Sequence, residues 1–263
     1  MSQLFQPITL GPIALKHRVV LAPLTRLKDP TLDLVSASDI PSVAGAQEKP
    51  RPLTVAEIEE YVGLYAQAAK NAMEAGFDGV EIHDANGCLL DQFLQDVSNN
   101  RTDTYGGSAE NRARFPLGVV KAVTDAVGQD RTGIRLSPWS PFAGMGMADP
   151  VPTFTHLVSG IARLYPELAY LSLIEPRISA DVTVEASPEN AAYAGGYTRA
   201  TAIQLADRNR NALVAFGRTF IANPDLPIRL EKGIPLHPYD RSTFYLPGEE
   251  PKGYTDQPFA TVA

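Results

Sequence analysis

Five short segments consist of near-continuous apolar residues, many of them β-branched, and each ends in polar residues or a sharp turn. They are residues 17–26, 77–87, 132–140, 168–177 and 212–218. A strand that is buried on both faces has this pattern, because neither face needs polar side chains. The pattern therefore predicts five strands of a parallel sheet.

Between these strands, apolar positions recur at spacings of three and four, as they do along one face of a helix. The clearest helix spans 54–76 and opens with a capping box formed by Thr54 and Glu57. A second helix is expected within 108–128, where Pro116 favours a start near that proline. Shorter candidates are 152–166, 198–209 and 223–233. The alternation of strands and helices predicts an α/β fold.

Two stretches interrupt this alternation. Residues 27–51 are rich in proline and contain no convincing strand or helix, and residues 178–195 hold at most one short apolar run. A structureless link of about twenty-five residues is unusual inside a compact domain. We expect one domain over residues 1–263, with 27–51 as an irregular link.

Composition and charge restrict the classes of function. The net charge is −7 without a basic block, which argues against a nucleic-acid partner. One cysteine forms no internal disulfide, the first residues lack a signal-peptide layout, and no apolar run reaches the ~20 residues of a membrane helix. Acidic residues show no metal-ligand spacing, so no metal site is predicted. These features predict a cytoplasmic enzyme first and a soluble binding protein second, with no membrane partner.

Six motifs follow one another in a specific order. They are APLTR (22–26), EIHDANG (81–87), SNNRTDTYGGSAENRARF (98–115), GIRLSPW (133–139), AFGRTFIANPDL (215–226) and YDRSTFY (239–245). Together they resemble the old yellow enzyme family, above all its fungal members. The resemblance implies a flavin mononucleotide (FMN) enzyme on a (β/α)8 barrel. Such enzymes pass hydride from NAD(P)H to an alkene conjugated to a carbonyl, in an enone or enal.

The resemblance assigns seven residues to the flavin. Pro23 and Thr25 match residues that pack on the isoalloxazine and hydrogen-bond its O4 region. Arg135 matches the cation near N1 and O2, where reduced flavin accumulates negative charge. The phosphate site combines glycines, which allow close backbone approach, with an arginine suited to a dianion. Its residues are Gly195, Gly196, Gly217 and Arg218.

Four further residues match the substrate side of the flavin. His83 and Asn86 match the pair that donates hydrogen bonds to the substrate carbonyl, which stabilises enolate-like charge as hydride arrives. Tyr245 resembles a tyrosine that lines this side. Cys88 occupies the position where the family has a proton-donating tyrosine, and an ordinary thiol (pKa ~8.5) is a stronger acid than tyrosine (~10). By this position Cys88 is the candidate catalytic residue, and the alternative is a small buried hydrophobic residue.

The family pattern also shows what this chain lacks. About two βα units are missing after the first strand, and the seventh strand, before Gly195, is weak. The predicted fold is therefore an incomplete parallel sheet derived from a (β/α)8 TIM barrel. Residues 17–26 then pair directly with 77–87, or a homodimer covers the exposed strand edges.

Three hypotheses for function follow. The first is an FMN-dependent ene-reductase. The second is an isomerase or other non-reductive catalyst that uses the carbonyl clamp of His83 and Asn86, because Cys88 replaces the proton donor. The third is a truncated, non-catalytic relative that no longer binds flavin, because strands are missing.

Overall fold

The structure is a computed structural model of the whole chain. It describes residues 2–21, 33–41, 49–174, 196–210, 212–244, 252–253 and 256–260. The chain divides into two compact units. Within the described residues, unit 1 comprises parts of Met1–Thr9, Ala14–Leu32 and Ala186–Ala263, and unit 2 comprises parts of Leu10–Ile13 and Asp33–Glu185.

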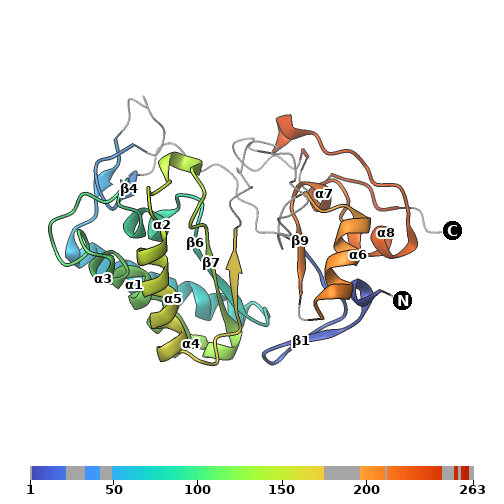
Figure 1. Cartoon of the computed structure of the whole chain (residues 1–263), viewed down its shortest axis with the longest axis horizontal. Coiled ribbons are helices and arrows are strands. Elements are labelled where there is room, and N and C mark those ends of the chain that lie inside the picture. The colour runs from blue at the N-terminus through green and yellow to red at the C-terminus, as the bar shows by residue number, and fades with distance from the viewer. Residues whose placement is uncertain are drawn as a thin grey trace. The chain divides into compact units, whose positions relative to one another are not determined.

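Unit 2 contains a parallel sheet. Its strands, in spatial order, are β6 (Val80–Asp84), β7 (Thr132–Leu136) and β8 (Tyr170–Leu173). Ile82, Ile134 and Leu136 are buried in one core cluster with side chains of the surrounding helices. These helices lie along one face of the sheet (Figure 1), and they are α1 (Val55–Glu74), α4 (Arg114–Val127) and α5 (Val151–Leu164). Because side chains alternate along a strand, the opposite face carries Glu81, His83, Gly133 and Arg135.

The helix starts follow the predicted capping residues. Thr54 accepts a hydrogen bond from the Glu57 backbone N–H at 3.2 Å, which confirms the capping box of α1. The predicted helix within 108–128 is divided into α3 (Ala109–Arg112), which Ser108 caps, and α4, which has Pro116 in its first turn. The proline lacks a backbone N–H, and that loss costs little in a first turn.

Unit 1 is built around a second parallel pair, β3 (Val19–Leu21) with β9 (Val214–Phe216). Its helices are α6 (Arg199–Arg208), α7 (Arg218–Ile221) and α8 (Leu226–Lys232). A separate core cluster joins the two strands to α6 and α8, with Val19, Val214 and Leu226 among its buried side chains.

Short elements complete the described part of both units, in addition to the strands β4 and β5 that are described below. They are η1 (Gln3–Phe5), β1 (Ile8–Leu10), β2 (Ile13–Leu15), α2 (Leu89–Leu94), η2 (Gln129–Arg131), η3 (Phe142–Gly144) and η4 (Arg241–Thr243).

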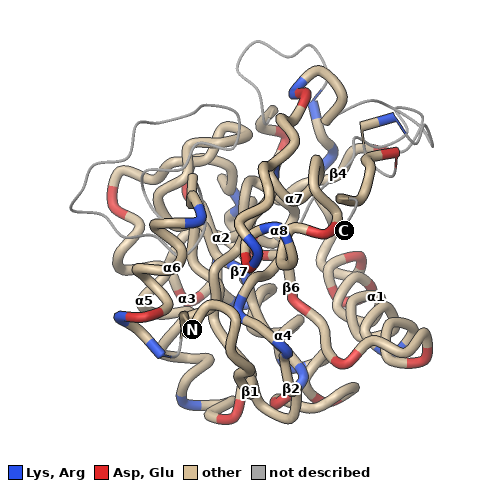
Figure 2. Tube along the Cα trace, turned by 90° about the vertical axis from the view of Figure 1, so that its right-hand side faces the viewer, with Lys and Arg blue, Asp and Glu red and all other residues tan. Residues whose placement is uncertain are grey.

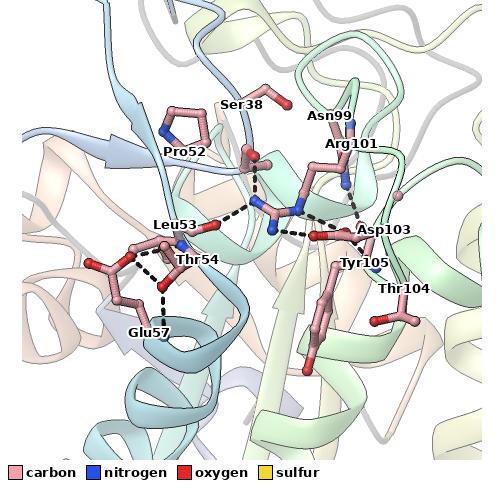
Figure 3. Close-up of polar contacts among 12 residues, drawn as sticks. Ser38, Pro52, Leu53, Thr54, Glu57, Asn99, Arg101, Asp103, Thr104 and Tyr105 are labelled. Carbon is pink, nitrogen blue, oxygen red and sulfur yellow. Dashed lines mark hydrogen bonds and ion pairs between the residues drawn. The ribbon is translucent and has the colours of Figure 1, made fainter.

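The predicted link is more ordered than its sequence indicates. Its described part contains β4 (Val35–Ser36), which pairs in parallel with β5 (Arg51–Pro52). The expectation of no strand between residues 27 and 51 was wrong at this point. Arg101 holds the pair, because its Nη1 donates to the Ala37 carbonyl at 3.0 Å and to the Leu53 carbonyl at 2.7 Å (Figure 3). A distant side chain thus orders backbone that has no strong local preference.

Strands lie within all five predicted segments, and the three shorter helices are confirmed at Val151–Leu164, Arg199–Arg208 and Leu226–Lys232. Residues 22–26 and 175–177 of two of these segments lie outside the described residues. Direct pairing of 17–26 with 77–87 concerns strands of different units and stays a prediction, as does the single domain over 1–263. The weak seventh strand lies outside the described residues. Along the described trace, Lys and Arg are interspersed with Asp and Glu in each unit (Figure 2).

Candidate functional site

A row of three polar side chains crosses the sheet of unit 2 near the carboxyl ends of its strands. In the strand register His83 is paired with Arg135, and Arg135 is paired with Ser172. All three lie on the face opposite the helices. The carboxyl ends of parallel strands are where α/β proteins place ligands. The structure therefore brings two predicted site residues, His83 and Arg135, together.

Arg135 is buried but not fully hydrogen-bonded. Its Nη1 donates to Ser172 Oγ at 2.9 Å, whereas its Nε is buried without a partner among the described residues. Burial lowers the pKa of Arg135, and the negative charge of Glu81 opposes that shift. From the sequence, Glu81 or Glu175 would be the charge partner of Arg135 in the absence of a flavin, and Glu175 lies outside the described residues.

His83 has a second unpartnered atom in the same row. Its Nδ1 is buried and makes no hydrogen bond within the part of the chain that the structure describes. Burial lowers the pKa of His83, and the charge of Arg135 adds to the effect. The imidazole is therefore neutral at pH 7, so one ring nitrogen carries a proton to donate and the other can accept.

A second row of residues, Glu81, Gly133 and Tyr170, lies on the same face of the sheet, two positions before the first row along each strand. The ring of Tyr170 lies over Gly133, where a Cβ atom would come within 2.4 Å of Tyr170 Cζ. The Tyr170 hydroxyl is close enough to Glu81 to lower the pKa of that carboxyl, whereas burial, the larger effect, raises it. Glycine at 133 thus lets a tyrosine reach across β7 to the carboxyl that neighbours Arg135.

Asn86 lies in the loop that follows β6. It adopts a left-handed backbone conformation with φ of 56°. Its N–H donates to Ser137 Oγ at 2.8 Å, and the next N–H, of Gly87, donates to Asp91 Oδ2 at 2.9 Å. Ser137 in turn donates to the same Asp91 oxygen at 3.2 Å. The loop conformation is thus held by two side chains, Ser137 and Asp91, that sequence reasoning did not identify.

Cys88 precedes α2 as its N-cap residue and makes no side-chain capping bond. Burial raises the pKa of its thiol, and the charges of Asp91 and Asp84 raise it further. The expectation that the thiol is a markedly stronger acid than tyrosine is weakened by these surroundings. The thiol is protonated at neutral pH.

Asp84 is a buried acid that the sequence did not single out. The residue is fully buried, and neither carboxyl oxygen has a hydrogen-bond partner. Burial, followed by the neighbouring Asp91 charge, raises its pKa well above the ordinary value. Both effects disfavour the ionised form of Asp84, which would place a second negative charge beside Asp91.

Unit 1 holds three of the predicted phosphate residues. Gly217 follows β9 and caps α7, and Arg218 is the first residue of that helix. The Arg218 guanidinium lies 5.9 Å from the centre of the Tyr239 ring. Gly196 has φ of +65°, with open space around the position of a Cβ, and precedes α6. These features are compatible with close approach of a ligand to the backbone.

Four of the predicted site residues, Pro23, Thr25, Gly195 and Tyr245, lie outside the described residues. Among those described, no group of three or more His, Cys, Asp or Glu side chains is arranged to hold a metal ion. In the same part of the chain, no helix is long and apolar enough to cross a membrane.

Comparisons with known proteins agree with the resemblance of the motifs. The NADH:flavin oxidoreductase / NADH oxidase family matches residues 28–237. The chain is 49% identical over 243 residues to chanoclavine-I aldehyde reductase fgaOx3 of Penicillium roqueforti (strain FM164), which covers 87% of this chain and 65% of that protein. It is 46% identical over 262 residues to the probable inactive dehydrogenase easA of Claviceps purpurea (strain 20.1), covering 90% of this chain and 67% of that protein.

Old Yellow Enzyme from Pichia sp. AKU4542 matches the structure with a TM-score of 0.82 and 28% identity, over 100% of this chain and 95% of that one. The match confirms the predicted fold class, an α/β fold derived from a TIM barrel. The chain spans only 65% of the length of fgaOx3, in agreement with an incomplete barrel.

Proposed function

The chain belongs to the NADH:flavin oxidoreductase / NADH oxidase family, and on that basis we propose that it binds FMN and reduces an alkene conjugated to a carbonyl, with hydride from NADH or NADPH. One observation carries the proposal. Arg135 Nε and His83 Nδ1 are both buried without a partner, side by side in the strand register. A buried polar atom without a partner is costly, so two in one row indicate a site that a polar ligand completes.

The residues in this row suit a flavin. Arg135 supplies a fixed positive charge and an unused N–H donor, which would hold the N1 and O2 edge of the isoalloxazine. Bound there, FMN would supply the hydride that NAD(P)H has delivered to it. The family resemblance assigns the phosphate to Gly196, Gly217 and Arg218, together with Gly195, and it adds Pro23 and Thr25 as further flavin contacts.

His83 and Asn86 would bind the substrate carbonyl. A neutral imidazole donates one hydrogen bond without giving up its proton, and the amide of Asn86 donates another. These two donors stabilise negative charge on the oxygen more strongly than the neutral carbonyl, and this difference lowers the barrier to reduction. Tyr245 would line the same side of the flavin.

Cys88 would donate the proton to the α-carbon. Its thiol is protonated at neutral pH, as a donor must be. Burial makes this thiol a weaker acid than an ordinary thiol, so we expect proton transfer from it to be slower than from an exposed cysteine. This same feature favours the second candidate function, a non-reductive reaction such as isomerisation at the His83 and Asn86 clamp.

The substrate class is an α,β-unsaturated aldehyde or ketone. The relative fgaOx3 is named for the reduction of an aldehyde, which supports an enal as the first substrate to test. The cytoplasmic location and the homodimer remain predictions, and sedimentation of the purified chain tests the latter.

Anaerobic reduction separates the candidates. NADPH should bleach the visible band of the flavin-loaded protein, and 2-cyclohexenone or an enal should restore it while the saturated product accumulates. Bleaching without reoxidation would contradict ene-reduction, and conversion to an isomer without NADPH would establish the second candidate. We expect Cys88→Tyr to accelerate the enone-dependent step, with Cys88→Ala as its control.

A further inference from the structure

Asn86 occupies a conformation that its loop must hold in place. Its φ of 56° lies in the left-handed region, which a residue with a side chain adopts at a cost. Gly87 follows with φ of +67°, and a Cβ there would lie 2.6 Å from Ala143 Cβ. Two successive left-handed residues place the Asn86 amide, so whatever fixes their backbone also fixes this half of the proposed clamp.

We propose that Asp91 is a positioning residue, which acts through Ser137 and the Gly87 N–H to hold Asn86 in place for a substrate carbonyl. The inference rests on the proposed function of Asn86. Asp91 Oδ2 accepts from Gly87 N–H at 2.9 Å and from Ser137 Oγ at 3.2 Å. Ser137 Oγ accepts from Asn86 N–H at 2.8 Å. One carboxyl oxygen therefore connects to both N–H groups of the strained pair.

The other oxygen of Asp91 is fixed by Gln95. Gln95 Nε2 donates to Asp91 Oδ1 at 3.0 Å. Gln95 cannot exchange its amide atoms freely, because its Oε1 accepts from the backbone N–H groups of Gly146 and Met147 at 3.1 and 3.3 Å. Asp91, Gln95 and Ser137 are all fully buried. Each position in the network therefore has a defined donor or acceptor role.

Because each atom of this network either donates or accepts, one single variant should break the network and one double variant should restore it. In Asp91→Asn, the new amide cannot accept from Ser137 and Gly87 without directing its NH2 at the NH2 of Gln95. In the double variant Asp91→Asn/Gln95→Glu, the carboxylate introduced at position 95 accepts from that NH2 and still accepts from Gly146 and Met147. The double variant restores every hydrogen bond and keeps the total charge, so it should rescue the loop.

Two measurements test the proposal. Amide hydrogen exchange of the segment that contains residues 85–88 reports loop order without any flavin. The ratio kcat/KM for an enone reports the clamp in the flavin-loaded enzyme. The variants are Ser137→Ala, which removes the relay without a change in charge, Asp91→Asn and the double variant. Asp125→Asn, on the exposed side of α4, is the matched control.

Losing a buried hydrogen bond should speed exchange at the Asn86 amide ~10-fold in Ser137→Ala and Asp91→Asn. Misplacement of the clamp should lower kcat/KM by ~10- to 100-fold. The double variant should return both values toward those of the wild type, and Ser137→Ala should add little to an Asn86→Ala change. A merely structural role would lower thermal stability and leave kcat/KM per folded molecule unchanged.

Unchanged exchange and unchanged kcat/KM in Ser137→Ala would overturn the proposal, and so would a double variant no better than Asp91→Asn in either measurement. If the wild type has no enone reductase activity, the proposed function fails. Exchange then still decides whether Asp91 and Ser137 hold the loop.

Discussion

Two arginines of unit 2, the nearly buried Arg101 and the buried Arg135, stand in contrasting surroundings. Arg101 donates to two backbone carbonyls, one of them that of Leu53, and to Asp103 (Figure 3). Its guanidinium lies 5.6 Å from the centre of the Phe93 ring. Arg135 is about as buried, yet it makes one described hydrogen bond, to Ser172, and leaves Nε without a partner.

The difference lies in how many of their N–H donors are hydrogen-bonded. We interpret Arg101 as a structural residue and Arg135 as a candidate ligand-binding residue. A buried guanidinium is tolerated when its donors are satisfied, and at Arg101 the protein satisfies them with its own backbone. At Arg135 the protein leaves a donor unsatisfied next to an unsatisfied histidine nitrogen. Burial alone therefore does not single out a candidate functional arginine, and the unused donor is the reason that we propose a ligand for Arg135.

The largest expected effect is on stability, at Arg101. Arg101→Met should lower the free energy of unfolding by about 3 kcal/mol, because the carbonyls of Ala37 and Leu53 lose their donor. Urea denaturation measures the loss. Arg51 is an exposed arginine that also pairs with two acids, Asp33 and Glu57, and Arg51→Met should change stability little. Equal losses in the two variants would contradict the assignment of Arg101 to the fold.

Arg135 should show the opposite behaviour. Arg135→Met should weaken FMN binding ~100-fold, the value of one or two charge-assisted hydrogen bonds. It should leave the flavin-free protein as stable as the wild type, because a buried charge with an unmet donor is removed. Fluorescence titration with FMN and urea denaturation measure the two quantities. A stability loss like that of Arg101→Met, with normal FMN affinity, would reverse the comparison.

The layer beneath Arg135 should respond to a single added methyl group. Gly133→Ala would place a Cβ 2.4 Å from Tyr170 Cζ and force the ring away from Glu81. We expect a loss of about 2 kcal/mol in stability from overpacking. Gly118→Ala, at a helical glycine with an ordinary contact distance of 3.6 Å, is the control and should not be destabilising. A fully stable Gly133→Ala would show that Tyr170 is not fixed over β7.

The smallest effect is a pH dependence at Asp91. Burial raises the pKa of Asp91 to about 6, above its value in the unfolded chain. The stability contributed by the protonated form is complete below pH ~4 and is lost as the pH rises through 6. The stability of the wild type relative to Asp91→Asn should therefore fall by on the order of 1 kcal/mol between pH 5 and 7. A difference that rises with pH would show that the pKa of Asp91 is lowered in the fold.

The sequence predicts those features whose signal is local. Thr54 and Ser108 cap helices that begin where their spacing indicates, because capping involves residues three positions apart. His83 and Arg135 were found because each lies in a long motif at a strand end. Short α2 was missed, since its N-cap residue, Cys88, makes no capping bond that a sequence pattern could signal.

Features that depend on distant residues were not predictable. Ser137 is 51 positions from Asn86 and 46 from Asp91, and Arg101 is 64 positions from Ala37. No periodicity or spacing links such residues, and only the parallel register of β6 and β7 brings the loops together. The same holds for β4 and β5, which are two residues long and are stabilised by a side chain elsewhere in the chain.

Uptake of FMN by the purified wild-type chain tests the central claim most directly. The visible spectrum should show a protein-bound flavin band that saturates at one FMN per chain, with the band lost in Arg135→Met and kept in Arg51→Met. A folded wild-type chain that shows no flavin band after unbound FMN has been removed would contradict the account. Its unpartnered Arg135 and His83 would then need a different ligand.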